Sequence, residues 1–427
     1  MRTAMTTDTL RQRHQHASAQ VPNSEHMPKQ PTAPAECTEH PGGRIKHGTW
    51  KQALRMFLFA VYFNGSVIAI AITQAIGAPL YFYSMDLFYA WMAMTKQHFG
   101  IVTTTMTYWW APVKMRISGD ESVRGQLKRT DDGRLECAFP ERMVLISNHQ
   151  IYTDWIYLWW IAYTSSLHGH LYIILKESIK YIPILGTGMM FYGFVFLSRK
   201  WSTDQERFRY RLKKLSTSHD GPLSGSKGLD PMWLLIFPEG TNLSDNGRKA
   251  SKKWADKNNM EDLQHALLPR STGLHFCLKE LNGSVEYMYD CTLAYEGVPV
   301  GQYGQDLFTL RSTYFQGRPP KSVNMHWRRF AIADIPLEDE EVFKDWVLAR
   351  WREKDDLLQY FVENNRFPAD EGVSKDGQKG AGWIETEVRP VKWAEWVQVF
   401  IPTATLALVI NVLIKMVNIV FRVLRVR

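Results

Sequence analysis

The chain has 427 residues, of which 45% are hydrophobic and 13% aromatic, and its formal net charge is +8. This length is enough for one large domain or two ordinary ones, each with a buried core. A basic balance suits either nucleic acid or an anionic membrane surface and does not by itself distinguish them. The basic residues are dispersed and form no nucleic-acid-binding motif, and the long apolar runs favour the membrane. The four cysteines lie far apart without histidines at metal-ligand spacing, so we expect neither a disulfide framework nor a metal site.

The N-terminal part combines a polar tail with an apolar segment. Residues 1–47 are rich in Gln, His, Thr and Pro, which predicts a disordered tail. Residues 48–100 predict membrane-embedded helices, because 56–94 is strongly apolar and about 20 such residues cross a bilayer. Gly77-Ala78-Pro79 interrupts the segment, which is therefore either a spanning helix followed by a second helix or a helical hairpin. A hairpin would keep the flanking basic residues on one side of the membrane: Lys51, Arg55 and Lys96.

Residues 101–335 predict an α/β domain in which helices flank a mixed sheet. Short apolar runs bounded by turn residues are typical of strands that are covered on both faces. The runs that predict strands are 142–147, 172–175, 191–197 and 233–237. Residues 204–215 predict a helix, and residues 216–229, rich in Ser, Gly and Pro, predict a surface loop.

The C-terminal part predicts two further segments. Residues 336–390 read as an extension, with a polar helix at 345–364 followed by a loop. Residues 391–427 predict a membrane helix, because tryptophans precede an apolar run and basic residues follow it. A helix lying in the membrane interface is the alternative.

His149 and Asp154 lie five positions apart, directly after the predicted strand 142–147. A carboxylate that bonds one imidazole nitrogen fixes the tautomer, so that the other nitrogen can take a proton from a hydroxyl group. Taken alone, a pair at this spacing is more often a structural histidine near a solvated carboxylate.

Two further segments follow predicted strands. Glu239-Gly240-Thr241 comes after 233–237, where Gly240 permits close approach of a ligand, although alone it indicates only a turn. Arg199 follows 191–197, and its planar fork suits a phosphate group or, alternatively, a surface salt bridge.

In this order and spacing, the segments resemble the glycerophospholipid acyltransferase family, which is marked by a His, four residues and then an Asp. The four matching blocks are Asn148-His149 to Asp154-Trp155, residues 193–199, Phe237 to Thr241, and residues 293–299. The resemblance covers residues 50–335. Segments 254–258 and 268–273 are most similar to the eukaryotic branch that contains 1-acylglycerol-3-phosphate and lysocardiolipin acyltransferases. Asn242 stands where many members carry an arginine.

The resemblance implies transfer of an acyl chain from acyl-CoA to a free hydroxyl of a lysophospholipid, with 1-acylglycerol-3-phosphate favoured as acceptor. It assigns His149 as general base and Asp154 as its orienting partner. The residues that it assigns to substrate binding are Asn148, Lys176, Arg199, Glu239, Gly240, Thr241 and Pro299. Acyl-CoA is a co-substrate, and no metal or other cofactor is implied.

Several alternatives remain open at this point. The acceptor can instead be lysocardiolipin or lysophosphatidylinositol. The chain can also be a CoA-independent transacylase, which would use the same His–Asp pair, or a non-catalytic membrane scaffold. The family branch implies the endoplasmic reticulum membrane, with the mitochondrial membrane or lipid droplets as alternatives. The oligomeric state is left open.

Overall fold

The computed structural model describes residues 39–198, 200–220 and 227–425. Most of the predicted tail and Arg199 lie outside the described residues. The helices are α1 (Thr49–Gly77), α2 (Leu80–Tyr83), α3 (Met85–Trp110), α4 (Asp154–Thr164), α5 (Leu185–Phe191), α6 (Trp201–Leu215), α7 (Asp245–Lys257), α8 (Ser271–Leu281), α9 (Gly304–Leu307), α10 (Glu340–Asn364) and α11 (Ile401–Arg425). The strands are β1 (Lys114–Gly119), β2 (Leu127–Arg129), β3 (Leu135–Cys137), β4 (Arg142–Ser147), β5 (Leu171–Lys176), β6 (Val195–Leu197), β7 (Ser218–Asp220), β8 (Lys227–Leu229), β9 (Met232–Ile236), β10 (Tyr287–Tyr295), β11 (Ser322–Ala331) and β12 (Ile384–Glu387).

The main sheet has eight strands in the order β12-β1-β11-β10-β4-β9-β5-β6. Strands β10, β4, β9, β5 and β6 run parallel to one another, whereas β11 is antiparallel to β10 and β12 is antiparallel to β1. The predicted α/β fold with a mixed sheet is therefore confirmed. Five parallel neighbours place their carboxyl ends along one edge, which is where such sheets carry their sites.

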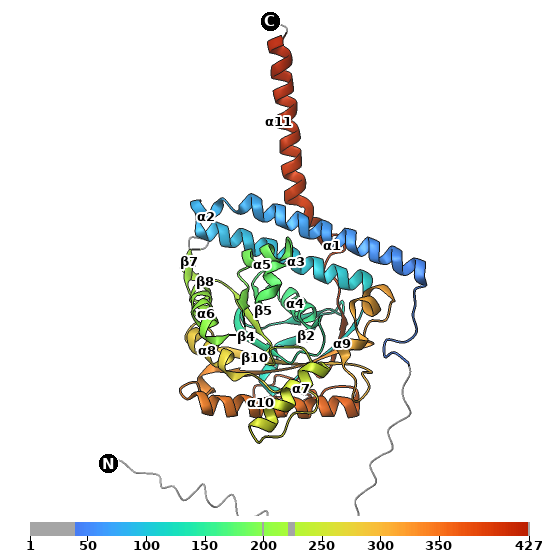
Figure 1. Ribbon diagram of the computed structural model, residues 1–427, viewed down its shortest axis with the longest axis vertical. Helices are drawn as coiled ribbons and strands as arrows, with labels where there is room; N and C mark the ends of the chain where they lie inside the picture. The colour runs from blue at the N-terminus through green and yellow to red at the C-terminus, as the bar shows by residue number, and fades with distance from the viewer. Residues whose placement is uncertain (1–38, 199, 221–226, 426–427) are drawn as a thin grey trace, which may run out of the picture. The chain divides into compact units, whose positions relative to one another are not determined.

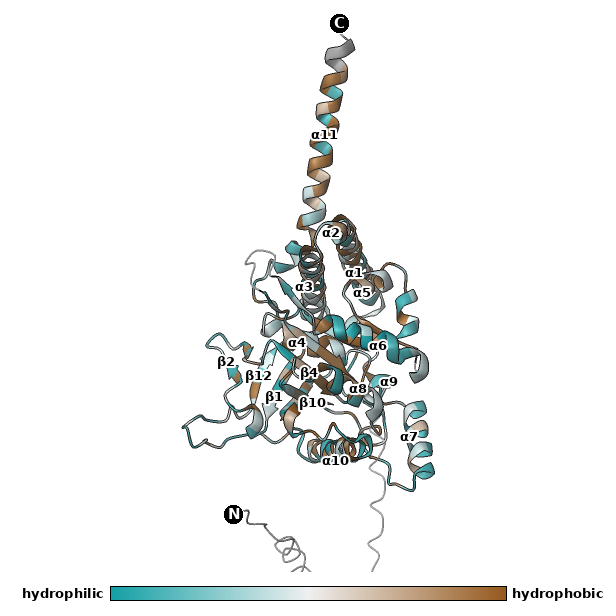
Figure 2. Cartoon of the chain, turned by 90° about the vertical axis from the view of Figure 1, so that its left-hand side faces the viewer, coloured by the Kyte–Doolittle hydropathy of each residue, from teal (hydrophilic) through white to brown (hydrophobic). Residues whose placement is uncertain are grey.

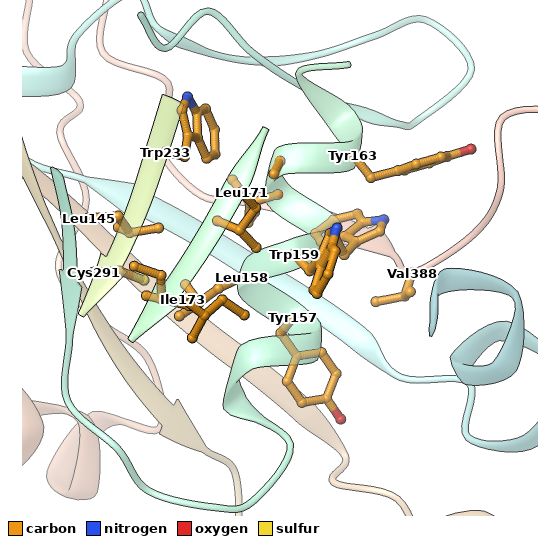
Figure 3. Close-up of a cluster of buried hydrophobic side chains, with 14 of the residues drawn as sticks. Leu145, Tyr157, Leu158, Trp159, Tyr163, Leu171, Ile173, Trp233, Cys291 and Val388 are labelled. Carbon is orange, nitrogen blue, oxygen red and sulfur yellow. The ribbon is translucent and has the colours of Figure 1, made fainter. Parts of the chain in front are cut away.

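Both faces of the sheet are covered by helices, as the apolar strands predict (Figure 1). Along β4, Met143 and Leu145 join a core cluster with α3, α4 and α5, whereas Val144 and Ile146 join a second cluster with α6, α8 and α10. This alternation follows from the two-residue period of a strand. Figure 3 shows part of the first cluster, in which side chains of α4 lie with those of the neighbouring strands. The two clusters make the central strands a rigid support for the residues at their ends.

Three segments differ from the sequence predictions. The predicted strand 191–197 is shortened to β6, because α5 occupies its start and Gly193 turns the chain with φ +74°. The predicted loop 216–229 contains the antiparallel pair β7 and β8. The predicted extension 336–390 contributes β12 to the edge of the main sheet and α10 to its second face, so it packs as part of the domain.

Helices α1 and α3 form a hairpin and lie side by side (Figure 1). The break predicted at Gly77-Ala78-Pro79 ends α1, and a side chain at Gly77 would clash with the indole of Trp91, since its Cβ would lie 2.1 Å from Trp91 Cδ1. Trp91 Nε1 also donates to the carbonyl of Thr73 at 2.8 Å. Lys96 was predicted to flank the apolar segment at the membrane surface, but it is buried inside the protein. Its Nζ lies 3.4 Å from the centroid of the Tyr172 ring. Much of α3 is therefore a core helix of the domain.

Two helical segments, Thr49–Tyr83 and Glu395–Phe421, are long and apolar enough to cross a membrane. The first is partly covered by α3, whereas the most apolar window of the second has no buried residue. Figure 2 shows that α11 extends away from the α/β domain and carries many hydrophobic residues with hydrophilic ones between them. An exposed apolar surface of this kind is typical of a site that contacts a membrane or another protein.

Candidate active site

The sequence motifs meet at one edge because their strands are parallel neighbours. Ile146 of β4 pairs with Ile236 of β9, and Ser147 pairs with Cys291 of β10. The segments that follow β4 and β9 therefore leave the sheet side by side, and they carry His149 and Glu239. The end of β10 brings Tyr295 to the same place.

The His149–Asp154 pair is formed, with 2.8 Å between His149 Nδ1 and Asp154 Oδ2. Asp154 is the first residue of α4 and is completely buried. Its Oδ2 also accepts the backbone N–H of Gln150 at 2.6 Å and that of Ile151 at 3.0 Å, while its Oδ1 accepts the hydroxyl of Tyr295. With this set of donors the carboxylate needs no water, and its position is fixed.

The imidazole of His149 is held by stacking as well as by hydrogen bonding. Its ring lies on Phe237 with 4.3 Å between centroids and an interplanar angle of 23°. The backbone of His149 accepts the N–H of Leu243 at 2.7 Å. Because Nδ1 must donate to the carboxylate, Nε2 is the basic nitrogen, and among the described residues no group bonds to it. The side chain is 20% exposed, so a small substrate group can reach this nitrogen.

Glu239 is a buried carboxyl group beside this pair. Its Oε2 accepts the backbone N–H of His149 at 3.3 Å, and its Oε1 accepts Trp351 Nε1 at 3.5 Å. Burial is the largest effect on its pKa and raises it to about 8, against the smaller lowering effects of these two donors and of Lys354. Both hydrogen bonds are longer than is usual for an ionised carboxylate, which agrees with a carboxyl group that keeps its proton near neutral pH.

Asn148 has a structural partner. Its side-chain amide donates to the carbonyl of Leu293 at 2.9 Å, and its Oδ1 accepts the N–H of Leu293 at 2.8 Å. The residue is fully buried. These two bonds join the end of β4 to β10 and hold the loop that starts at His149.

The other predicted binding residues that the structure describes lie at the same edge of the sheet with different exposures. Lys176 ends β5 and is exposed, Thr241 and Pro299 are half-buried, and Arg199 lies outside the described residues. Gly240 has φ +71° and closes a turn in which its N–H donates to the carbonyl of Phe237 at 2.9 Å. Such a φ favours glycine.

Helix α10 supports the site, although nothing in its local sequence indicates this. Trp351 contacts Glu239, and the carboxylate of Asp355 accepts backbone N–H groups of three successive residues at 2.7–2.9 Å: Gln264, His265 and Ala266. The carbonyl of His265 in turn accepts Gln150 Nε2 at 3.0 Å. Tyr295 was also not identified from the sequence as a partner of Asp154. The position of Tyr295 within the fourth family block, residues 293–299, is the signal that could have indicated a role in the site.

Comparison with known proteins places this geometry in a family. The family model described as "Acyltransferase" matches residues 115–296, and the one described as "Acyltransferase C-terminus" matches residues 313–385. The first range contains His149, Asp154 and Glu239, and the second contains all of α10. The His–Asp pair, Glu239 and their supporting helix thus fall within matched regions, whereas Pro299 lies between the two regions.

Individual relatives agree with the family models. An uncharacterized acyltransferase of Schizosaccharomyces pombe is 36% identical over 75% of this chain and 88% of its own length. A 2-acyl-1-lysophosphatidylinositol acyltransferase of Saccharomyces cerevisiae is 38% identical over 65% of this chain and 76% of its own length. A probable 1-acyl-sn-glycerol-3-phosphate acyltransferase of Arabidopsis thaliana is 31% identical over 55% of this chain and 57% of its own length. With its His–Asp pair at the end of a parallel strand, this chain belongs to the glycerophospholipid acyltransferase family.

Proposed function

We propose that this protein transfers an acyl chain from acyl-CoA to a free hydroxyl of a lysophospholipid. The observation that carries the proposal is the His149–Asp154 pair. A buried carboxylate with all its donors in place holds Nδ1, and Nε2 has no hydrogen-bond partner among the described residues. A general base of this kind needs no nucleophile from the enzyme, because the acceptor supplies the hydroxyl.

The proposed reaction is a direct transfer. His149 Nε2 takes the proton of the acceptor hydroxyl while the hydroxyl oxygen bonds to the thioester carbonyl carbon. Asp154 stabilises the imidazolium that forms. The tetrahedral intermediate then loses its carbon–sulfur bond, and the CoA thiolate takes the proton from the imidazolium. The products are a diacyl phospholipid and free CoA.

The turn at Glu239, Gly240 and Thr241 is proposed to hold the glycerol phosphate of the acceptor. A protonated Glu239 can donate a hydrogen bond and adds no negative charge near Asp154 or a phosphate, and Thr241 offers a hydroxyl. Holding the acceptor beside a fixed base replaces an encounter in solution and supplies much of the rate enhancement.

The membrane is the proposed source of the acceptor. The apolar face of α1 and residues 401–421 of α11 expose large hydrophobic side chains, including Phe57, Ile68, Leu408 and Ile419. We propose that α11 spans the bilayer while α1, packed against α3, lies along its surface, and that the membrane is that of the endoplasmic reticulum. Co-localisation of a fluorescent fusion with markers of that membrane, mitochondria and lipid droplets tests the last point.

Two lysophospholipids are the leading candidates for the acceptor. The yeast relative named as a lysophosphatidylinositol acyltransferase is 38% identical, and the plant relative named for 1-acylglycerol-3-phosphate is 31% identical. We therefore place lysophosphatidylinositol first. 1-Acylglycerol-3-phosphate, which the sequence motifs favoured, is the second candidate.

Release of free CoA by the purified full chain in detergent tests the proposal. Oleoyl-CoA is supplied with each of a panel of lysophospholipids, and the product is identified by mass spectrometry. The His149→Ala variant is assayed alongside, together with a reaction that contains a diacyl phospholipid as donor in place of acyl-CoA. We expect release with one or a few acceptors and none from His149→Ala.

Three results would contradict the proposal or one of its parts. Acyl transfer from the phospholipid donor without CoA release would identify a transacylase. A folded preparation that transfers no acyl chain from either donor would favour a non-catalytic scaffold. Substantial turnover by folded His149→Ala would remove His149 from its assigned role.

A further inference from the structure

Arg270 is an arginine beside the site to which none of the sequence motifs assigns a role. It is exposed and immediately precedes α8. Its side chain lies over Gly240, since a Cβ at Gly240 would be 3.4 Å from Arg270 Nε and 3.6 Å from its Cζ. The missing side chain of Gly240 therefore leaves room for the guanidinium to reach the turn that follows Glu239.

The backbone around Arg270 is held from several directions. The N–H of Arg270 donates to the carbonyl of Pro238 at 2.8 Å, which ties the two segments together. Upstream, the N–H of Leu268 donates to Ser251 Oγ at 3.1 Å, and Asp355 binds the three N–H groups of residues 264–266. The guanidinium thus extends from a fixed segment, and binding a ligand requires little ordering of the backbone.

The positive charge of Arg270 is available to a ligand. Within the described residues, no carboxylate lies within ion-pair distance of its guanidinium. The guanidinium also donates no hydrogen bond to any described residue. By contrast, Arg248 in the neighbouring helix α7 is paired with Asp262 at 3.3 Å. The next residue after Thr241, Asn242, is bonded to Gln305. Among the described residues, Arg270 therefore offers this turn a guanidinium without an acidic partner.

We propose that Arg270 binds the phosphate of the lysophospholipid acceptor. The inference rests on the proposed function, because it assigns a residue to the acceptor of that reaction. A guanidinium fork can donate two parallel hydrogen bonds to two phosphate oxygens. CoA also carries phosphates, but the position of Arg270 over the Glu239-Gly240-Thr241 turn, beside His149, favours the group next to the reacting hydroxyl.

Steady-state kinetics with both substrates varied distinguish the two sources of phosphate. Arg270→Gln removes the charge, and Arg270→Lys keeps the charge but removes the fork. A charge-assisted hydrogen bond contributes about 1.5–3 kcal/mol, so we expect Arg270→Gln to raise the KM for the lysophospholipid about 10- to 100-fold. The KM for acyl-CoA is expected to stay within about twofold of wild type, and Arg270→Lys to lie between wild type and Arg270→Gln.

Arg352→Gln is the matched control, because Arg352 is an exposed arginine on α10 that lies outside the proposed site. Thermal unfolding of each variant verifies folding. Protection against thermal unfolding by glycerol 3-phosphate provides a measurement that needs no turnover. We expect protection of wild type and Arg352→Gln, and a loss of protection in Arg270→Gln.

The outcomes separate the inference from the proposed function. An unchanged KM for the lysophospholipid in folded Arg270→Gln would overturn the inference, as would a rise confined to the KM for acyl-CoA. A wild-type protein that transfers no acyl chain would refute the proposed function. In that case, protection by glycerol 3-phosphate would be the measurement that tests phosphate binding by Arg270. Equal protection of wild type and Arg270→Gln, or none in either, would count against it.

Discussion

The buried carboxyl group of Glu239 predicts a specific pH dependence of stability. Its pKa is raised from the ordinary 4.5 to about 8, chiefly by burial. Between these two pH values the folded protein keeps the proton, whereas the unfolded chain has lost it. The stabilisation that this proton provides is complete below pH 4.5 and is lost as the pH rises through about 8.

The size of the effect follows from the same two values. They differ by about 3.5, and each pH unit corresponds to about 1.36 kcal/mol, so the upper bound is about 5 kcal/mol. Glu239→Gln keeps the size of the side chain but cannot ionise. The difference in free energy of unfolding between wild type and Glu239→Gln should therefore change by up to about 5 kcal/mol between acidic and alkaline pH, with wild type losing stability as the pH rises.

Denaturant unfolding in detergent, followed by tryptophan fluorescence from about pH 5 to about pH 9, measures this difference. Glu261→Gln serves as control, because Glu261 is exposed and should give a difference that is nearly independent of pH. If the wild-type and Glu239→Gln curves stay parallel over the whole range, the carboxyl group does not hold its proton as described. A difference that changes in the opposite direction would refute the reasoning about burial.

Three further substitutions test the surroundings of the site. Asp154→Asn should lower kcat by about 10²- to 10⁴-fold while the melting temperature changes little, because an amide can hold the loop but cannot stabilise the imidazolium; a kcat near wild type would contradict this. Asn148→Ala leaves the N–H and C=O of Leu293 unpaired in the core and should cost about 2–4 kcal/mol in the free energy of unfolding, measured with denaturant. Trp351→Phe removes a donor that lowers the pKa of Glu239, so the pH at which the Glu239-dependent stability is lost should move upward; a downward shift would argue against this contact.

Local sequence was a reliable guide where one residue pattern determines one structural feature. The apolar runs at β4 and β9 predicted strands covered on both faces, because such strands have no polar side to expose. The residues at their carboxyl ends were identifiable for the same reason, since the chain turns polar where it leaves the core. The break at Gly77-Ala78-Pro79 was equally visible, although whether it made a hairpin was not.

Contacts between distant segments required the folded chain. Residue pairs such as Trp351 with Glu239, Tyr295 with Asp154 and Arg270 with Gly240 are separated by between 30 and 141 positions. No local periodicity encodes such partners, because each depends on the register of parallel strands and on the packing of a helix across the sheet. The burial of Lys96 has the same origin. A sequence pattern reports the environment that a side chain prefers, whereas the free energy of the whole packed domain decides which neighbour it meets.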